Sequence, residues 1–315
     1  MEDLVAVKDL NGKNVFLGLQ HTFVMFGSTV LVPIMTGLDI GVALFAAGIG
    51  TLLFHVVTGF KVPVFLGSSF AFIPGLLAVG QKNPDLIPYA LGGILVAGFL
   101  YVIVSILFRF ISNDTIHRIL PAHVTGPMII LIGLILAPVA IQNSDGTNAP
   151  HIVEMIGANG CWAVALFTFA VGVFVKIVFP RFGWKFAANL PVLIALVTGY
   201  AFSIIIGIVD FSPVVEAAWV GIPAFSLPKF SASAITVMVP IAIVTIVEHF
   251  GDVLAIGNVV GKDFIKTPGI HKTLIGDGLA TSLSAFMGGP ANTTYSENTG
   301  AIALTGVTNP VIMRI

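Results

Sequence analysis

Residues 289–300 read Gly289-Pro-Ala-Asn-Thr-Thr-Tyr-Ser-Glu-Asn-Thr-Gly300, and this stretch decides how the rest of the chain is interpreted. It begins as an extended segment and passes through small polar residues into a short helical run. An earlier stretch, Val62-Pro-Val-Phe-Leu-Gly-Ser-Ser-Phe-Ala-Phe-Ile-Pro-Gly75, follows the same plan. Unwound backbone at membrane depth is tolerated only where it faces protein or a water-filled cavity. Paired interruptions of this kind indicate a ligand site at the membrane midplane.

Composition places the whole chain in lipid. Of its 315 residues, 57% are hydrophobic and 9% are charged, whereas an ordinary soluble domain has roughly 25% charged residues. A net charge of −1 gives no indication of a nucleic-acid partner. The single cysteine, Cys161, excludes an internal disulfide. We therefore expect an all-α polytopic protein whose solvent is the lipid bilayer.

A helix needs about 20 apolar residues to cross the bilayer core. Segments of that kind predict ten crossings, at residues 15–36, 40–59, 62–80, 87–110, 122–142, 160–179, 187–209, 232–256, 270–289 and 291–309. If the N-terminus is cytoplasmic, 12 of the 14 lysines and arginines lie on the inner side, and only Lys82 and Lys229 lie outside. This positive-inside bias predicts a multi-pass protein with a cytoplasmic N-terminus.

The spans also carry an internal repeat. Gln20-His21 in the first span and Glu248-His249 in the eighth are 228 positions apart, and Ser69-Phe70 in the third and Ser296-Glu297 in the tenth are 227 apart. Because seven spans separate each pair, the repeat predicts a seven-helix unit used twice with inverted topology. A complete second copy needs further spans after Ile315, so we expect a fragment truncated after about ten spans. The alternative is a natural ten-span protein.

Acidic residues inside apolar spans are the strongest functional candidates. Residues 230–261 hold two charged residues, Glu248 and Asp252, which are four apart and share a helix face. Residues 278–313 hold one, Glu297. A charge at such depth costs at least about 2.5 kcal/mol and normally marks a substrate or ion path. The alternative is that these acids pair with buried polar groups and lock helices together.

Other polar residues in the spans receive a weaker interpretation. Asp277, between two glycines, is expected to pack helices or to support the site. For Gln20 and His21 a functional role and a structural role have equal weight. His55 has no counterpart in the repeat and is expected to be structural. No spacing of ligand-type residues indicates a metal site or a nucleophile–base pair, which disfavours an enzyme.

The interrupted spans supply the other half of the predicted site. Phe70 and Ser296 stand where the two half-helices start, and the free amides there can donate to carbonyl oxygens of a ligand. Phe70 and Tyr295 add aromatic faces, although such residues also pack against lipid or the core. The implied ligand is small, flat and polar-edged. Because burial favours the neutral form of a carboxyl group, Glu248 or Glu297 can carry a coupling proton.

At these positions the chain resembles the nucleobase–ascorbate transporters, also called nucleobase–cation symporter-2, and most closely the bacterial uracil permeases. The resemblance runs along the whole chain. It rests on Gln20-His21, on Gly67-Ser-Ser-Phe-Ala-Phe72, on Glu248-His-Phe-Gly-Asp252, and on Asn292-Thr-Thr-Tyr-Ser-Glu-Asn-Thr-Gly300 with Thr305.

The resemblance implies a fourteen-span fold of two inverted repeats, with a short strand and a half-helix in spans three and ten. Spans one to four and eight to eleven would form a core domain, and the others a gate domain. Residues 1–111 would then be the first part of the core, 112–230 the first part of the gate, and 231–315 the second part of the core. The rest of span eleven and spans twelve to fourteen would be absent.

By match to the family, the two glutamates Glu248 and Glu297 would hold the nucleobase, and Asp252 is expected to be a further substrate contact. Phe70 would contribute its ring and backbone, and Ser296 its backbone amide, with Tyr295 beside that contact. Supporting roles are expected for Asn298, Gln20, His21 and Ser69.

Two positions give mixed indications of substrate. Uracil permeases commonly have a histidine at the position of Asp252, where it contacts substrate and couples protons, and purine transporters more often have aspartate. Xanthine and urate transporters usually have glutamine at the position of Glu297, where uracil permeases have glutamate. Ser296 replaces a glycine that is frequent in uracil permeases. We favour uracil because the residue at 297 faces the edge of the ring.

We therefore expect uracil uptake by proton symport across a bacterial cytoplasmic membrane, with an elevator-type movement and no cofactor. Glu248 and Asp252 are the expected proton-coupling residues. The alternatives are a xanthine or purine permease on the same fold, and a uniporter or channel without proton coupling. Because relatives are often dimers, the full-length protein is expected to be a homodimer.

Overall fold

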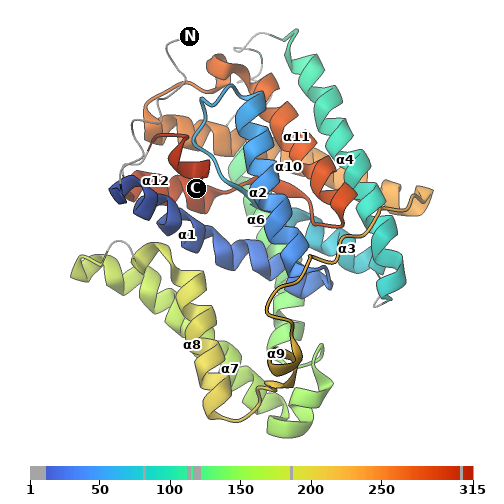
Figure 1. The fold of residues 1–315 in the computed structure, drawn as a ribbon, viewed down its shortest axis with the longest axis vertical. Coiled ribbons are helices and arrows are strands. Elements are labelled where there is room, and N and C mark those ends of the chain that lie inside the picture. The colour runs from blue at the N-terminus through green and yellow to red at the C-terminus, as the bar shows by residue number, and fades with distance from the viewer. Residues whose placement is uncertain are drawn as a thin grey trace. The chain divides into compact units, whose positions relative to one another are not determined.

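The computed structural model describes residues 12–80, 83–111, 115, 122–184, 187–305 and 308–314. By its internal contacts the chain divides into two units, residues 1–132 with 223–315, and residues 133–222. The larger unit thus joins the first and last parts of the chain, drawn in blue to teal and in orange to red in Figure 1. Residues 223–230, which the sequence assigns to the gate, belong to the larger unit, where the Lys229 amide donates to the Pro88 carbonyl oxygen (2.8 Å). The division into core and gate domains stays a prediction.

Helices make up most of the described chain. The long ones are α1 (Gly12–Thr36), α2 (Ile40–Val57), α4 (Ile87–Phe108), α6 (Ala122–Ser144), α7 (Pro150–Val178), α8 (Pro191–Ile205), α10 (Ala232–Val260) and α11 (Ile270–Met287). Shorter helices are α3 (Ile73–Gly80), α9 (Ser212–Glu216) and α12 (Ser296–Thr305). Single turns are η2 (Phe70–Phe72), η3 (Pro84–Leu86), η4 (Phe179–Phe182), η5 (Ala187–Asn189), η6 (Ile265–Gly269) and η7 (Ile312–Arg314). The strands are β1 (Leu66–Ser68) and β2 (Asn292–Thr294).

Each of the ten predicted crossings contains helix, which confirms the helical membrane fold. Four apolar helical stretches of the described chain are long enough to cross a membrane on their own, namely Ile40–Val57, Pro84–Phe108, Pro150–Phe182 and Ala232–Val260. The largest difference in bounds is at α7, which starts at Pro150 rather than 160. Gly157 has φ 71° and ψ 164°, so the turns before it form a separate helical segment that joins the span at a kink.

Close helix packing forms the core of the larger unit. Helix α11 lies between α2 and α4 (Figure 1). A Cβ atom added to Gly98 of α4 would lie 2.6 Å from the Gly278 carbonyl oxygen of α11, and one added to Gly276 would lie 2.8 Å from the Phe54 ring of α2. Small residues let membrane helices approach closely, since lipid gives no hydrophobic drive for their association.

Large apolar side chains also lie on the outer faces of the helices. Examples from the two units are Phe99, Ile103, Phe169 and Phe174, each more than half exposed. In water this much exposed apolar surface would be a liability, whereas for a membrane-spanning helix it is the face that meets lipid.

The two interrupted segments meet in an antiparallel strand pair. Leu66 pairs with Thr294, Gly67 with Thr293 and Ser68 with Asn292, and all six residues are buried. Backbone amides at the two ends of β1 find hydrogen-bond acceptors in neighbouring segments. The Leu66 amide donates to Thr51 Oγ1 (2.9 Å), and the Ser69 amide donates to the Ala291 carbonyl oxygen (2.8 Å). The prediction of short strands in spans three and ten is confirmed.

Candidate functional site

The site is built on the two half-helices that follow these strands. Helix turn η2 starts at Phe70, with only Ser69 between it and β1, and α12 starts at Ser296, with only Tyr295 between it and β2, as the sequence predicts. Because the strands run in opposite directions, the two helix starts flank the short sheet at its opposite ends. The first amides of each half-helix have no partner inside the helix and carry its positive dipole end. The arrangement therefore offers two sets of donors to a ligand.

Glu248 lies on α10, the helix that packs against this arrangement. Helix α10 contacts η2, α3, β2 and α12, so it packs against both interrupted segments. The carboxylates of Asp252, Asp277 and Glu297 are all close enough to act electrostatically on Glu248. Its Oε2 atom is buried and accepts no hydrogen bond from the described residues. A buried acceptor without a partner is costly, and a ligand N–H group would satisfy it.

Glu297 lies in the first turn of α12, and its side chain is exposed. Its Oε1 atom accepts a hydrogen bond from the Ser28 hydroxyl of α1 (3.4 Å). Ser28 is 3% exposed, and sequence reasoning missed it. The available signal was its spacing, because Ser28 follows His21 by seven positions and so lies on the same face of α1.

Asp252 joins α10 to the junction between β2 and α12. It is 5% exposed, and each carboxylate oxygen accepts a hydroxyl hydrogen bond, Oδ2 from Thr294 (2.9 Å) and Oδ1 from Ser296 (2.7 Å). The structure therefore shows Asp252 as a support for the start of α12, and its contact with a substrate stays a prediction. The Ser296 hydroxyl is engaged by Asp252, which leaves the helix-start amide of that residue as its ligand group.

Tyr295 lies between the strands rather than on an open face. Its ring is 4% exposed and its hydroxyl donates to the Ser68 carbonyl oxygen (2.7 Å). A Cβ atom added to Gly67 would lie 2.5 Å from the tyrosine ring, so the glycine makes room for it. In this structure Tyr295 fastens β2 to β1, and a direct contact of its ring with a ligand stays a prediction.

The remaining predicted residues surround the strand pair. Phe70 is partly exposed, whereas the Ser69 hydroxyl is buried and has no hydrogen-bond partner among the described residues. Asn298 is fully buried, its Nδ2 atom donates to the Pro63 carbonyl oxygen (3.2 Å), and its side chain hydrogen-bonds with His21. Asn298 thus ties α12 to the extended segment before β1 and to α1. The Gln20 side chain is outside the described residues.

Two further histidines are buried near the site. His55 Nε2 lies 2.7 Å from the Val64 carbonyl oxygen and so holds the extended segment, which fits the structural role expected of it. His249 Nδ1 lies 3.3 Å from Asp277 Oδ2, and both side chains are fully buried. Asp277 therefore connects α11 to α10. Within the part of the chain that the structure describes, no group of histidine, cysteine and acidic residues could hold a metal ion.

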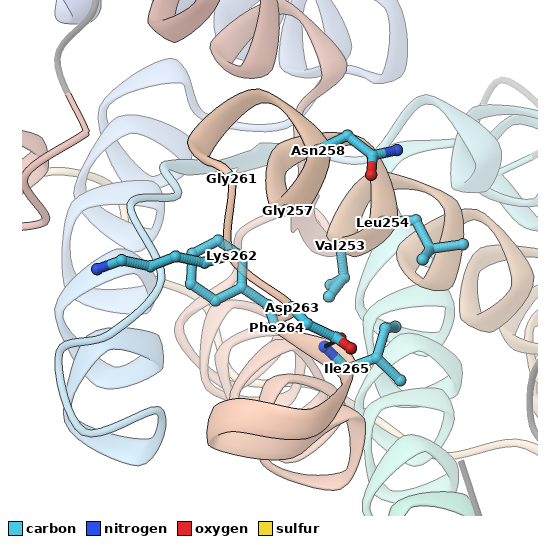
Figure 2. Close-up of a pocket in the computed structure, with 9 residues that line it drawn as sticks. All are labelled: Val253, Leu254, Gly257, Asn258, Gly261, Lys262, Asp263, Phe264 and Ile265. Atoms are coloured by element: carbon cyan, nitrogen blue, oxygen red, sulfur yellow. Dashed lines mark hydrogen bonds between the residues drawn. The ribbon is translucent and has the colours of Figure 1, made fainter. Parts of the chain in front are cut away.

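A pocket of about 340 Å³ opens at the C-terminal end of α10 (Figure 2). It is lined by the last turns of α10, the following loop and the start of η6, that is by Val253, Leu254, Gly257, Asn258, Gly261, Lys262, Asp263, Phe264 and Ile265. None of the predicted site residues lines it. The Asp263 carboxylate in this loop caps η6 by accepting from the amides of Ile265 and Lys266 (both 3.1 Å), so its role there is structural.

Comparison with known proteins identifies a family model and several relatives that this chain matches. The family model Xan_ur_permease, described as a permease family, matches residues 12–315. The probable uracil permease of Pasteurella multocida is 41% identical over 319 residues, which cover 98% of this chain and 72% of that protein. The uracil permease of Bacillus subtilis is 41% identical over 300 residues, which cover 93% of this chain and 67% of that protein.

Two solved structures have a similar fold. The transmembrane domain of the cyanobacterial bicarbonate transporter BicA aligns with a TM-score of 0.68 at 17% identity, over 98% of this chain and 81% of that one. The structure of SLC26A9 aligns with a TM-score of 0.66 at 14% identity, over 98% of this chain and 52% of that one. At such low identity these two likenesses show the fold alone.

Proposed function

The chain belongs to the permease family whose model matches residues 12–315, and from that membership we propose that it takes up a nucleobase, uracil, across a bacterial cytoplasmic membrane. It is a multi-pass membrane transporter rather than an enzyme. The observation that carries the substrate proposal is the set of relatives named uracil permease, which are 36–42% identical over most of the chain.

The geometry of the site supports this substrate class. Uracil presents alternating N–H and C=O groups around a flat ring. Glu248 has a buried oxygen free to accept an N–H group, and Glu297 is exposed to read a second edge. The helix-start amides at Phe70 and Ser296 would donate to the carbonyl oxygens. An analogue that leaves one of these buried partners unsatisfied loses about 1–3 kcal/mol.

Xanthine or another purine is the second candidate substrate. The resemblance places aspartate in purine transporters where this chain has Asp252, and histidine there in uracil permeases. In the structure the two carboxylate oxygens of Asp252 accept hydrogen bonds from two hydroxyl groups, those of Thr294 and Ser296. A residue so engaged is a weaker determinant of substrate than Glu248 or Glu297, and we retain uracil.

We also propose that uptake is coupled to protons. The carboxyl groups of Asp252, Asp277 and Glu297 are each near enough to Glu248 to act on it electrostatically. Carboxylates that share a buried site cannot all ionise at neutral pH, so at least one holds a proton. Glu248, with Asp252 beside it, is the proposed coupling group. The core would carry the site past the gate as a rigid body, in a homodimer with its N-terminus in the cytoplasm.

Uptake of labelled uracil in cells lacking their own uracil permease tests these proposals. We expect accumulation above the outside concentration, its collapse with a protonophore, and little competition from excess xanthine. Strong competition by xanthine without uracil uptake would identify a purine permease. Equilibration of uracil without accumulation, unaffected by the protonophore, would identify a uniporter or channel.

A further inference from the structure

Threonines on two helices bond the backbone of the two strands. The Leu66 amide of β1 donates to Thr51 Oγ1 of α2 (2.9 Å), and Thr281 Oγ1 of α11 donates to the Asn292 carbonyl oxygen of β2 (2.6 Å). The threonines are 2% and 0% exposed. A sheet of two strands has an unpaired edge on each strand, and at membrane depth no water satisfies its backbone groups. The two hydroxyl groups therefore take the place that neighbouring strands have in a larger sheet.

Each helix makes a second contact, to the extended segment before its strand. On α2, His55 Nε2 lies 2.7 Å from the Val64 carbonyl oxygen. On α11, the Ser284 hydroxyl donates to the Pro290 carbonyl oxygen. Each of these side chains comes one turn after the threonine of its helix, on the same helix face, and contacts the segment two residues earlier. Helix and segment thus run in opposite directions and are joined at two points in both copies.

The two helices have equivalent places in the sequence repeat. Helix α2 lies in the second predicted span and α11 in the ninth, seven spans later, and Thr51 and Thr281 are 230 positions apart. The pairs that define the repeat are 227 and 228 apart. The bonded strand residues, Leu66 and Asn292, each lie four residues before the start of the following half-helix. The same arrangement of helix, hydroxyl, strand and half-helix start therefore occurs twice.

We propose that Thr51 and Thr281 are positioning residues for the ligand, each of which holds the half-helix start that follows its strand. Thr51 would place the Phe70 amide and Thr281 the Ser296 amide. The proposal rests on the proposed function, in which these two amides donate to the two carbonyl oxygens of uracil. Neither threonine touches the ligand. Each acts through the backbone of one strand, so each controls the recognition of one carbonyl group.

Hydrogen–deuterium exchange of the purified protein tests the positioning without transport. Thr51→Val nearly keeps the side-chain volume but removes the acceptor of the Leu66 amide, so exchange in peptides covering residues 62–72 should become about tenfold faster. Thr281→Val should have this effect in peptides covering residues 289–300. Thr51→Ser and Thr281→Ser keep the hydroxyl and should restore the wild-type rates. Unchanged exchange in the valine variants would overturn the proposal.

Competition of labelled uracil uptake by 2-thiouracil and 4-thiouracil tests the effect on recognition. Sulfur accepts hydrogen bonds more weakly than oxygen, so each analogue should bind the wild type more weakly than uracil does. Each valine variant should raise the KM for uracil about three- to tenfold. It should also narrow the difference between uracil and one analogue, and the two variants should do so for different analogues. Equal losses for uracil and both analogues would reduce the threonines to a structural role and refute the proposal.

Thr273→Val is the matched control. Thr273 also lies on α11 and is 0% exposed, but its hydroxyl donates to the Ile270 carbonyl oxygen of its own helix (3.0 Å). The variant should change neither the exchange of the two segments nor the relative binding of the analogues. If the wild type binds uracil and both analogues equally, the carbonyl contacts of the proposed function are wrong. The exchange measurements would still decide whether the threonines hold the half-helix starts.

Discussion

Removal of the Ser296 hydroxyl should weaken uracil transport, because Asp252 loses a hydrogen bond by which it supports the start of α12. In the structure that hydroxyl and the hydroxyl of Thr294 donate to the two oxygens of Asp252, at 2.7 and 2.9 Å. Ser296→Ala leaves Oδ1 of a carboxylate that is 5% exposed without its donor. Hydrogen bonds to a charged group contribute about 1.5–3 kcal/mol each, and a buried charged acceptor left alone costs at least as much.

The expected consequence is a change at the start of α12. Asp252 holds the turn that presents the Ser296 amide and the Glu297 carboxylate, so loss of one of its two bonds lets this turn shift away from the ligand. The lost hydrogen bond costs up to about 3 kcal/mol. If half of that free energy destabilises the conformation that binds uracil, the KM for uracil rises about tenfold. Thr294→Val, which nearly preserves side-chain volume, should act in the same direction through Oδ2.

Initial rates of uracil uptake over a range of concentrations, normalised to the amount of protein in the membrane, measure this effect. A double variant with Asp252→His and Ser296→Gly reproduces the pair that the resemblance places in uracil permeases. It should transport better than Ser296→Gly alone, because no carboxylate is then left without its donor. If Ser296→Ala keeps the wild-type KM and thermal stability, Asp252 does not hold the start of α12, and the reasoning fails.

Three further predictions concern neighbouring contacts. Ser28→Ala removes a long hydrogen bond to Glu297, so it should raise the KM for uracil only a few-fold, at about 0.5–1 kcal/mol, in the same uptake assay, whereas Ser28→Thr should have little effect. Tyr295→Phe leaves the Ser68 carbonyl oxygen without its donor and should lower the free energy of unfolding by about 1–3 kcal/mol, seen as earlier thermal unfolding; an unchanged transition would show that the strand pair does not depend on this bond. Glu248→Gln keeps the shape of the side chain but cannot ionise, so accumulation of uracil driven by a proton gradient should disappear, and full accumulation would remove Glu248 from the coupling role.

The sequence predicts the backbone of this protein well because lipid restricts the choices. A long apolar stretch in a membrane must be helical, so the bounds of α2 and α4 follow closely from hydropathy. The same restriction makes the proline-rich and polar stretches in spans three and ten conspicuous, and both contain a strand and a half-helix. The start of α7 was missed because His151, Glu154 and Asn159 lower the hydropathy of the turns around Gly157, and hydropathy does not detect that such polar turns are still helical.

The partners of the polar residues were harder to predict. Acidic residues in apolar spans are visible in the sequence because each is costly, which is why Glu248, Asp252 and Glu297 stand out. Their donors are not visible, since serines and threonines are common in membrane helices and a hydroxyl costs little to bury when it bonds to its own helix. Ser28 could be assigned to Glu297 only once the structure brought α1 and α12 together.

The register of the strand pair connects the repeat in the sequence to the geometry of the site. An offset of 227 positions carries Leu66 to Thr293 and Gly67 to Thr294. In the structure Leu66 pairs with Thr294 and Gly67 with Thr293, so each residue pairs with the counterpart of its neighbour. Every antiparallel pairing of two equivalent strands has such a local twofold axis, which here passes between the two pairs and agrees with the axis expected of two inverted copies. A shift of one residue would move this axis onto a residue pair and turn the buried side chains to the other face. The strand pair therefore places the two half-helix starts in equivalent positions, as the proposal that both donate to one ligand requires.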